Sequence, residues 1–230
     1  MAERGKRAYG TLTLVLLLTV MMCVEMFAGV ARLHLLFNSL GLRAETWSWT
    51  EPSSYGRMLS YTVLHSNGQH FFWNALLILL VGTVVEQRVG SRWIVGLFVA
   101  GALIAAVSQL VIFPNETRPL VGASGIGSAL FGAVVVIAGS DGFEIRLFPS
   151  SRWFALTLRR VLLAWVVIQI AALMMSYATP SAPVTVAYWA HLAGFAIGLL
   201  GGYAFRHLGS VEREPLAEPG LVSSFGAAGD

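Results

Sequence analysis

Six runs of apolar residues follow one another along the chain. They cover residues 11–31, 70–87, 93–113, 120–139, 161–177 and 184–205. A helix rises about 1.5 Å per residue, so roughly 20 apolar residues cross the hydrocarbon core of a bilayer. Because a chain in lipid must satisfy its backbone hydrogen bonds internally, the pattern predicts an all-α protein with six transmembrane helices.

Composition supports a membrane protein and excludes several other classes. Of the 230 residues, 56% are hydrophobic and only 12% are charged, and the mean hydropathy is +0.71. Soluble proteins carry about a quarter charged residues, so this chain cannot cover a water-exposed surface with charge. The one cysteine, Cys23, allows no disulfide within this sequence.

The basic residues predict the orientation in the membrane. When alternate connections are summed, eleven of the fifteen Lys and Arg residues fall on the side that holds both termini. Cytoplasmic connections carry the excess of Lys and Arg, so both termini are predicted to be cytoplasmic. The same distribution accounts for the net charge of +3, and no basic stretch is interleaved with stacking aromatics. Nucleic acid is therefore not an expected partner.

Three segments follow from this topology. Residues 1–10 form a cytoplasmic segment, residues 11–206 form the membrane domain, and residues 207–230 have the composition of a disordered tail. The first run could instead be a signal peptide, but it is longer than an ordinary signal core, so a retained helix is favoured.

The outer connection, about residues 32–69, is rich in Trp and Tyr. It is either an interfacial anchor or a loop that shapes a site.

Polar residues inside the apolar runs are the candidates for chemistry, because an unpaired polar group is costly in hydrocarbon. They are Glu25, His70, Asn74, Glu86, Ser108, Gln109, Ser124, Ser128, Gln169 and His191. The predicted topology places four of them, His70, Asn74, Ser124 and His191, at one depth in the outer half of the membrane. The histidine and asparagine of the second run, at i and i+4, share one helix face.

A serine and a histidine at one depth are the components of nucleophilic acyl transfer. His191 could take the proton of the Ser124 hydroxyl and later give it to the leaving amine. Donors for the resulting oxyanion could come from His70, Asn74 and the Ser124 backbone. Glu25 is not assigned as an acidic third member.

Small residues predict that the fourth and sixth helices pack closely. Gly194, Gly198 and Gly202 form a stripe on the same helix face as His191, and Gly125 begins a thin face on the fourth helix. Each feature also has an ordinary interpretation. The Gly-x-Ser-Gly match could be a packing motif, and a membrane histidine could bond a carbonyl or belong to a proton path.

Taken together, these residues resemble the rhomboid family of intramembrane serine proteases, over roughly residues 55–203. Gly122-Ala123-Ser124-Gly125 is similar to the family's nucleophile motif, and Ala190-His191-Leu192-Ala193-Gly194 is similar to its last-helix motif. The resemblance implies that Ser124 is the nucleophile, that His191 is the general base, and that His70 and Asn74 help form the oxyanion hole.

The resemblance also implies structural roles and shows two departures. Residues that match structural positions of the family or support its close packing are Arg57, Glu86, Gly90, Gly122, Gly125, Gly194 and Gly198. Many members carry an aromatic residue four positions after the nucleophile, where this chain has Ser128. The aromatic–Arg pair of the first loop is here Gly56-Arg57, and the nearest tryptophan is Trp49.

The sequence therefore predicts an intramembrane serine endopeptidase that cleaves transmembrane segments of other membrane proteins. Its partners are the lipid bilayer and these substrates, with no metal or cofactor, and a bacterial plasma membrane is favoured as its location. Two alternatives stay open: a catalytically inactive relative that binds transmembrane helices, and a small transporter that uses Glu25 and the histidines as an ion path.

Overall fold

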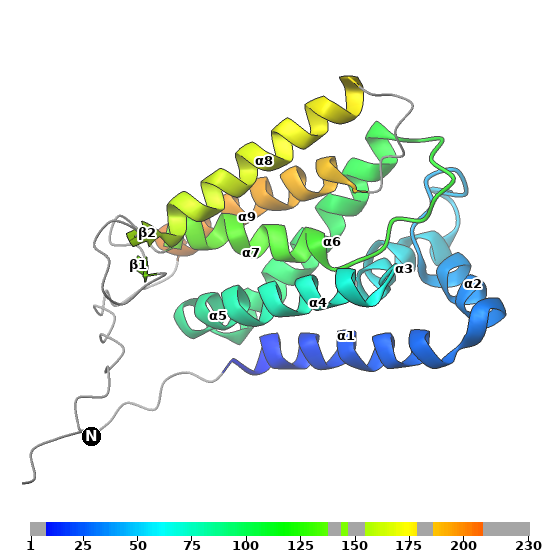
Figure 1. Ribbon diagram of the computed structural model, residues 1–230, viewed down its shortest axis with the longest axis horizontal. Helices are drawn as coiled ribbons and strands as arrows, with labels where there is room; N and C mark the ends of the chain where they lie inside the picture. The colour runs from blue at the N-terminus through cyan, green and yellow to red at the C-terminus, as the bar shows by residue number, and fades with distance from the viewer. Residues whose placement is uncertain (1–7, 138–143, 147–154, 179–185, 209–230) are drawn as a thin grey trace, which may run out of the picture.

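The computed structural model describes residues 8–137, 144–146, 155–178 and 186–208 (Figure 1). The secondary-structure elements, in chain order, are α1 (Tyr9–Phe27), α2 (Gly29–Leu40), α3 (Pro52–Ser60), η1 (Tyr61–Val63), α4 (Gly68–Leu77), η2 (Ile78–Gly82), α5 (Thr83–Val89), α6 (Ser91–Ile112), α7 (Ser124–Ile137), β1 (Glu144–Arg146), β2 (Ala155–Thr157), α8 (Leu158–Ala178) and α9 (Tyr188–Leu208). Apart from the short antiparallel pair of β1 and β2, these elements are helical, as predicted.

Four helical segments are long and apolar enough to cross a membrane. They are α1, the continuous segment Gly68–Val89 formed by α4, η2 and α5, α6, and residues Arg160–Ala178 of α8. Helix α7 is a shorter apolar helix of 14 described residues, and α9 has 21 residues. Each of the six predicted apolar runs overlaps one of these segments, so the chain is a helical, multi-pass membrane protein.

Three predicted boundaries were displaced by four residues. The sixth run was expected to begin at residue 184, but α9 begins at Tyr188. The other two displacements have local reasons. The first run was expected to reach residue 31, but α1 ends at Phe27, and Gly29 adopts a φ of +69° that starts α2 in a new direction. The fourth run was expected to begin at residue 120, but α7 begins at Ser124. Leu120 instead pairs with Leu42 in a β-bridge, and Gly122 has a φ of +108° that no helix contains. Residues 1–7, 138–139 and 184–185 lie outside the described residues, as do residues 209–230 of the tail that was predicted to begin at 207. Residues 207 and 208 belong to α9.

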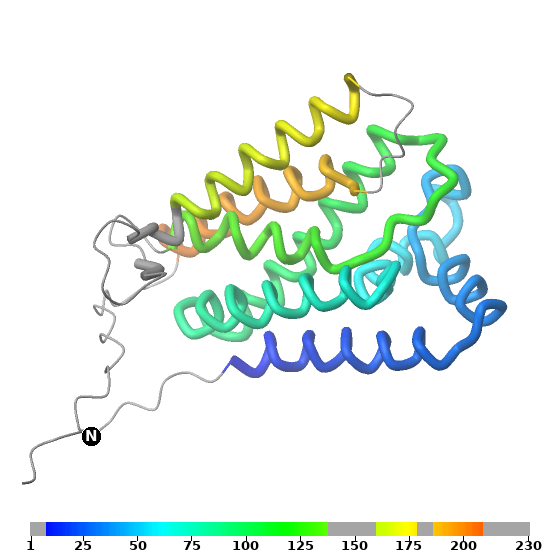
Figure 2. Tube along the Cα trace, in the orientation of Figure 1, coloured from blue at the N-terminus to red at the C-terminus, as the bar shows by residue number. Residues whose placement is uncertain are grey.

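Helix α7 forms the centre of the bundle. Eleven of its 14 residues are buried, and it packs against both α6 and α9, which also contact each other (Figures 1 and 2). Gly125 lies against Ala105 and Ala129 lies against Gly101, so α6 and α7 run antiparallel. Gly194 lies against Gly125 and Gly198 against Ala129, so α7 and α9 run parallel. Both helices therefore begin at the same end of the bundle, as alternating membrane crossings require.

Glycines set the distance between α7 and α9. A Cβ atom on Gly198 would overlap the carbonyl oxygen of Ala129, and a Cβ atom on Gly132 would overlap the carbonyl oxygen of Phe195. At Gly202 it would lie 2.8 Å from the carbonyl oxygen of Ala133. Only residues without a side chain allow the two backbones to touch in this way. The predicted close packing of the fourth and sixth helices is confirmed.

Helix α8 lies at an edge of the bundle, beside α9 (Figure 2). Most of its apolar side chains are exposed, including Val167, Ile168 and Met175, as suits a surface that faces lipid. Helix α1 covers the opposite edge and runs antiparallel to the segment formed by α4, η2 and α5 (Figure 1).

Candidate active site

The turn that leads into Ser124 lies directly against two side chains of α4. A Cβ atom on Gly122 would lie 2.6 Å from Cε1 and 2.7 Å from Nε2 of His70, and 3.4 Å from Nδ2 of Asn74. Both side chains therefore face the chain just before Ser124, as their i and i+4 spacing predicted. The absence of a side chain at Gly122, together with its positive φ, makes this approach possible.

The outer connection holds this turn in place. The Gly122 N–H donates to the carbonyl oxygen of Tyr61 at 3.0 Å, and Leu42 and Leu120 exchange backbone hydrogen bonds at 2.7 and 3.2 Å. The Tyr61 hydroxyl in turn donates to the carbonyl oxygen of Ala102 on α6 at 2.9 Å. The outer connection was interpreted either as an interfacial anchor or as a loop that shapes a site. These contacts with the turn before Ser124 favour the second interpretation.

The His70 ring is oriented by the residues just before α4. Asn67 caps that helix by accepting the backbone N–H of His70 at 2.8 Å, and the Ser66 Oγ lies 3.1 Å from His70 Nδ1. If the Ser66 hydroxyl donates to Nδ1, the ring proton is on Nε2, the nitrogen that faces Gly122. Asn74 is 8% exposed, and its Nδ2 has no hydrogen-bond partner within the described part of the chain. Both groups can thus present N–H donors beside Ser124.

His191 lies in the first turn of α9, and its ring contacts α8. Its Nδ1 lies 3.0 Å from the Oε1 of Gln169, and its ring centroid is 6.1 Å from that of Trp165, at a tilt of 34°. One turn further along α9, Gly194 lies against Gly125, the residue after Ser124. The two helices that carry the serine and the histidine are therefore in contact next to both residues.

Among the hydrogen bonds of the described residues, none joins the Ser124 hydroxyl to the His191 ring. Ser128 occupies the position at which many members of the resembled family carry an aromatic residue, and it donates to the carbonyl oxygen of Ser124 at 2.7 Å. The aromatic neighbour of His191 is Trp165, which comes from α8. Sequence reasoning noted Gln169 as a polar residue in an apolar run but assigned it no role, and it missed Trp165. The cost of an amide in hydrocarbon was the signal that Gln169 needed a partner.

Two residues predicted to be structural lie away from this cluster. Glu86 is 1% exposed and accepts the backbone N–H groups of Gly10 at 2.8 Å and Thr11 at 2.7 Å, and the Ser91 hydroxyl at 2.6 Å. It therefore joins the start of α1 to the junction of α5 and α6. The side chain of Arg57 lies on α3 and has no hydrogen bond or ion pair among the described contacts.

A second histidine lies behind His70. The ring of His65 is 5.3 Å from that of His70, and both of its nitrogens lack partners within the described residues. Burial, aided by the nearby His70, lowers the pKa of His65 to about 4. The His65 backbone N–H donates to the Glu25 carboxylate at 2.9 Å, which fixes the end of α1 to this connection. Sequence reasoning did not include His65 in the site.

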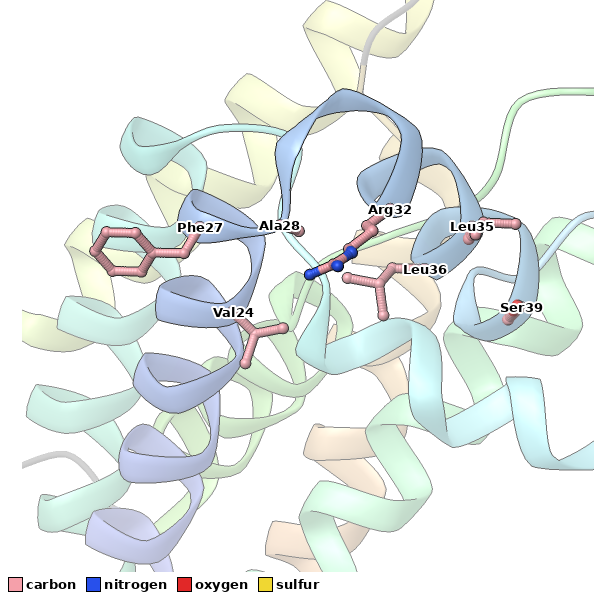
Figure 3. Close-up of a pocket in the computed structure, with 7 residues that line it drawn as sticks. All are labelled: Val24, Phe27, Ala28, Arg32, Leu35, Leu36 and Ser39. Carbon is pink, nitrogen blue, oxygen red and sulfur yellow. The ribbon is translucent and has the colours of Figure 1, made fainter.

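Other features of the surface do not belong to this site. An apolar recess between the end of α1 and α2 has Val24, Phe27 and Leu36 on its walls, and Arg32 points into it (Figure 3). None of the predicted site residues lines this recess. Within the described ranges, no three His, Cys, Asp or Glu side chains gather in a way that could hold a metal ion.

The fold and the site define a multi-pass helical membrane protein. The N-terminal parts of α4, α7 and α9 lie together, and they carry His70 and Asn74, Ser124, and His191, respectively. The family model described as the Rhomboid domain matches residues 52–208, more than half of the chain. The chain belongs to the rhomboid family. It is also similar to the Rhomboid protease GluP of Bacillus subtilis (strain 168), with 27% identity over 145 residues. The match covers 60% of this chain and 26% of that relative, so the chain spans only part of the relative's length.

Proposed function

We propose that this protein is an intramembrane serine endopeptidase that cleaves transmembrane segments of other membrane proteins. One observation carries the proposal. The turn before Ser124 lies against His70 and Asn74, while Gly194 brings the helix of His191 against Gly125. Ser124 thus lies between two kinds of group: the hydrogen-bond donors of His70 and Asn74, which could bind an oxyanion, and the helix that carries His191, the candidate base. The rhomboid domain match and the similarity to a rhomboid protease support the same activity.

In this proposal Ser124 is the nucleophile and His191 is the base. The Ser124 oxygen attacks the scissile carbonyl carbon while its proton passes to Nε2 of His191. The tetrahedral oxyanion accepts hydrogen bonds from the His70 ring, the Asn74 amide and the Ser124 backbone N–H. When the C–N bond breaks, His191 returns the proton to the leaving amine. A water molecule, deprotonated by His191, then hydrolyses the ester and regenerates Ser124.

The proposal includes the membrane topology. The chain crosses the membrane six times, with α7 and α9 as the two crossings beyond the four long apolar segments, and both termini are cytoplasmic. The site then opens toward the outer face, where water reaches Ser124 and a substrate helix can unwind. The bacterial relative and the apolar helices favour a bacterial plasma membrane.

The test is cleavage of single-span reporter proteins by the full chain in proteoliposomes. We expect cleavage by the wild type and a loss of at least about 1,000-fold in both Ser124→Ala and His191→Ala. Ser108→Ala is the matched control. Among the described residues, the hydroxyl of that serine bonds only within α6, to the carbonyl oxygen of Ala105, so its variant should cleave normally. Unchanged cleavage by either site variant would refute the assigned mechanism.

A catalytically inactive relative that binds transmembrane helices is the second candidate. It is favoured by one observation, since no hydrogen bond joins Ser124 to the His191 ring among the described residues. Catalytic hydrogen bonds are often long in unliganded sites, so the observation does not exclude an enzyme. Co-purification of reporters without cleavage by any form would select this second function.

A further inference from the structure

One amide side chain interrupts the apolar sequence of α8. Between residues 161 and 175, Gln169 is the only residue whose side chain carries a carbonyl oxygen. A polar group on a helix with lipid-facing sides is costly unless it has a partner. The partner of Gln169 is the imidazole of His191 on α9, at 3.0 Å between Oε1 and Nδ1.

The atoms of this contact determine where the imidazole carries its proton. With the amide oxygen facing the ring, the oxygen can only accept a hydrogen bond, so in this arrangement Nδ1 of His191 is the donor. A neutral imidazole carries one ring proton, and Nε2 is then left with a free lone pair. A free lone pair is what a general base needs in order to take the proton of a serine hydroxyl.

We propose that Gln169 is a positioning residue that fixes the tautomer and the orientation of His191, an inference that rests on the proposed role of His191 as the base. In serine hydrolases with three-membered sites, a carboxylate holds the histidine in the productive tautomer. Gln169 supplies the same acceptor without a charge. It therefore sets the position of the proton but adds no charge–charge stabilisation of the imidazolium.

A second contact from the same helix face supports this role. Trp165 precedes Gln169 by four residues, so the two side chains lie on one face of α8. Its ring packs near that of His191 and also meets Phe131 of α7, with centroids 5.1 Å apart. Position 128 of α7 carries a serine that bonds its own helix. The groups that orient the imidazole therefore come from α8.

A nearby hydrogen bond provides a matched control. The Trp189 Nε1–H donates to the Tyr177 hydroxyl at 3.0 Å, and this bond also joins α8 to α9. Tyr177→Phe removes that bond without touching the imidazole. If Gln169 acted only by holding the two helices together, the two changes would have similar effects.

The kinetic test compares Gln169→Leu, Gln169→Glu and Tyr177→Phe in the full chain, with a single-span reporter in proteoliposomes. We expect Gln169→Leu to lower kcat about 10- to 100-fold with KM within about two-fold, because proton transfer is impaired while substrate binding is not. Gln169→Glu restores an acceptor and should recover most of kcat at pH 8. Tyr177→Phe should match the wild type. Equal losses in Gln169→Leu and Tyr177→Phe, or no rescue by glutamate, would overturn the proposal.

A spectroscopic test is independent of activity. Nitrogen-15 NMR of histidine-labelled full chain in micelles distinguishes the two tautomers, and His191→Ala identifies the signals of His191. We expect a protonated Nδ1 in the wild type and in Tyr177→Phe, and a mixture of tautomers in Gln169→Leu. A protonated Nε2 in the wild type, or an unchanged spectrum in Gln169→Leu, would overturn the proposal. If the wild type cleaves nothing, the proposed function fails while this measurement still decides the role of Gln169.

Discussion

The contact between α7 and α9 can be tested with one methyl group. In Gly198→Ala, the new Cβ would overlap the carbonyl oxygen of Ala129 and lie 2.7 and 2.8 Å from its carbonyl carbon and Cα. These are backbone atoms of a buried helix, so no side-chain rotation relieves the clash. Ordinary contact begins at 3.4 Å. Clearing the carbonyl carbon alone therefore requires a shift of about 0.7 Å, and clearing the oxygen, which overlaps more deeply, requires about 1 Å or more.

The cost of this separation follows from the packing it removes. A gap of about 0.5–1 Å forfeits roughly a quarter to a half of the dispersion energy of each contact. Backbone shifts forced by an extra methyl group typically cost about 1–3 kcal/mol, and a clash with backbone atoms belongs at the upper end. We therefore expect Gly198→Ala to lower the free energy of unfolding by about 3 kcal/mol. It should also reduce cleavage, because in the proposed mechanism this helix contact holds His191 beside Ser124.

Gly96→Ala is the matched control for this substitution. Gly96 is an exposed glycine within α6, and a Cβ there would meet nothing within 4 Å. Alanine in a helix is favoured over glycine by about 1 kcal/mol, so this variant should be as stable as the wild type or more stable. Unfolding in mixed detergent–SDS micelles gives both free energies. Equal midpoints for the two variants would refute the reasoning from close contact.

Three further predictions concern Glu86, His65 and Gly122. Glu86→Gln replaces one of the acceptor oxygens that hold Gly10 and Thr11, so the free energy of unfolding should fall by about 2 kcal/mol in the same assay. The folded-state pKa of His65 is about 4, below its usual 6.5, so the unfolded state binds more protons between these values. Stability should therefore fall by up to about 3 kcal/mol as the pH drops from 6.5 toward 4, and His65→Phe should flatten this profile. Gly122→Ala forces a side chain into a φ of +108°, so cleavage should fall although the variant still inserts; normal cleavage would contradict the proposed turn geometry.

The helical elements could be predicted from sequence because the bilayer imposes one length on every crossing. The six apolar runs each overlap a helical segment for that reason. The glycine stripe predicted the packing of α7 on α9, since small residues at a fixed spacing have few other uses in a helix. The pairing of His70 and Asn74 on one face followed from helix geometry alone.

Contacts between distant segments could not be predicted in the same way. The start of α7 was displaced because Leu120 pairs with Leu42, and hydropathy contains no information on that bridge. Gln169 was visible as a polar residue in an apolar run, but its partner depends on how α8 lies against α9. The roles assigned to Ser124 and His191 remain predictions, because geometry shows which groups are neighbours and a rate measurement shows which of them react.

The bonds of Glu86 have a consequence for the order in which the chain assembles. The Thr11 N–H is satisfied by a carboxylate 75 residues further along the chain, and the residue before α1 provides no side-chain cap. At roughly 5–20 residues per second, a ribosome needs several seconds to reach that carboxylate after α1 has been made. During this interval, water must accept the hydrogen bonds of the free N–H groups in the first turn of α1. The helix can therefore enter the membrane early, while its attachment to the bundle is completed only after the second crossing has been synthesised.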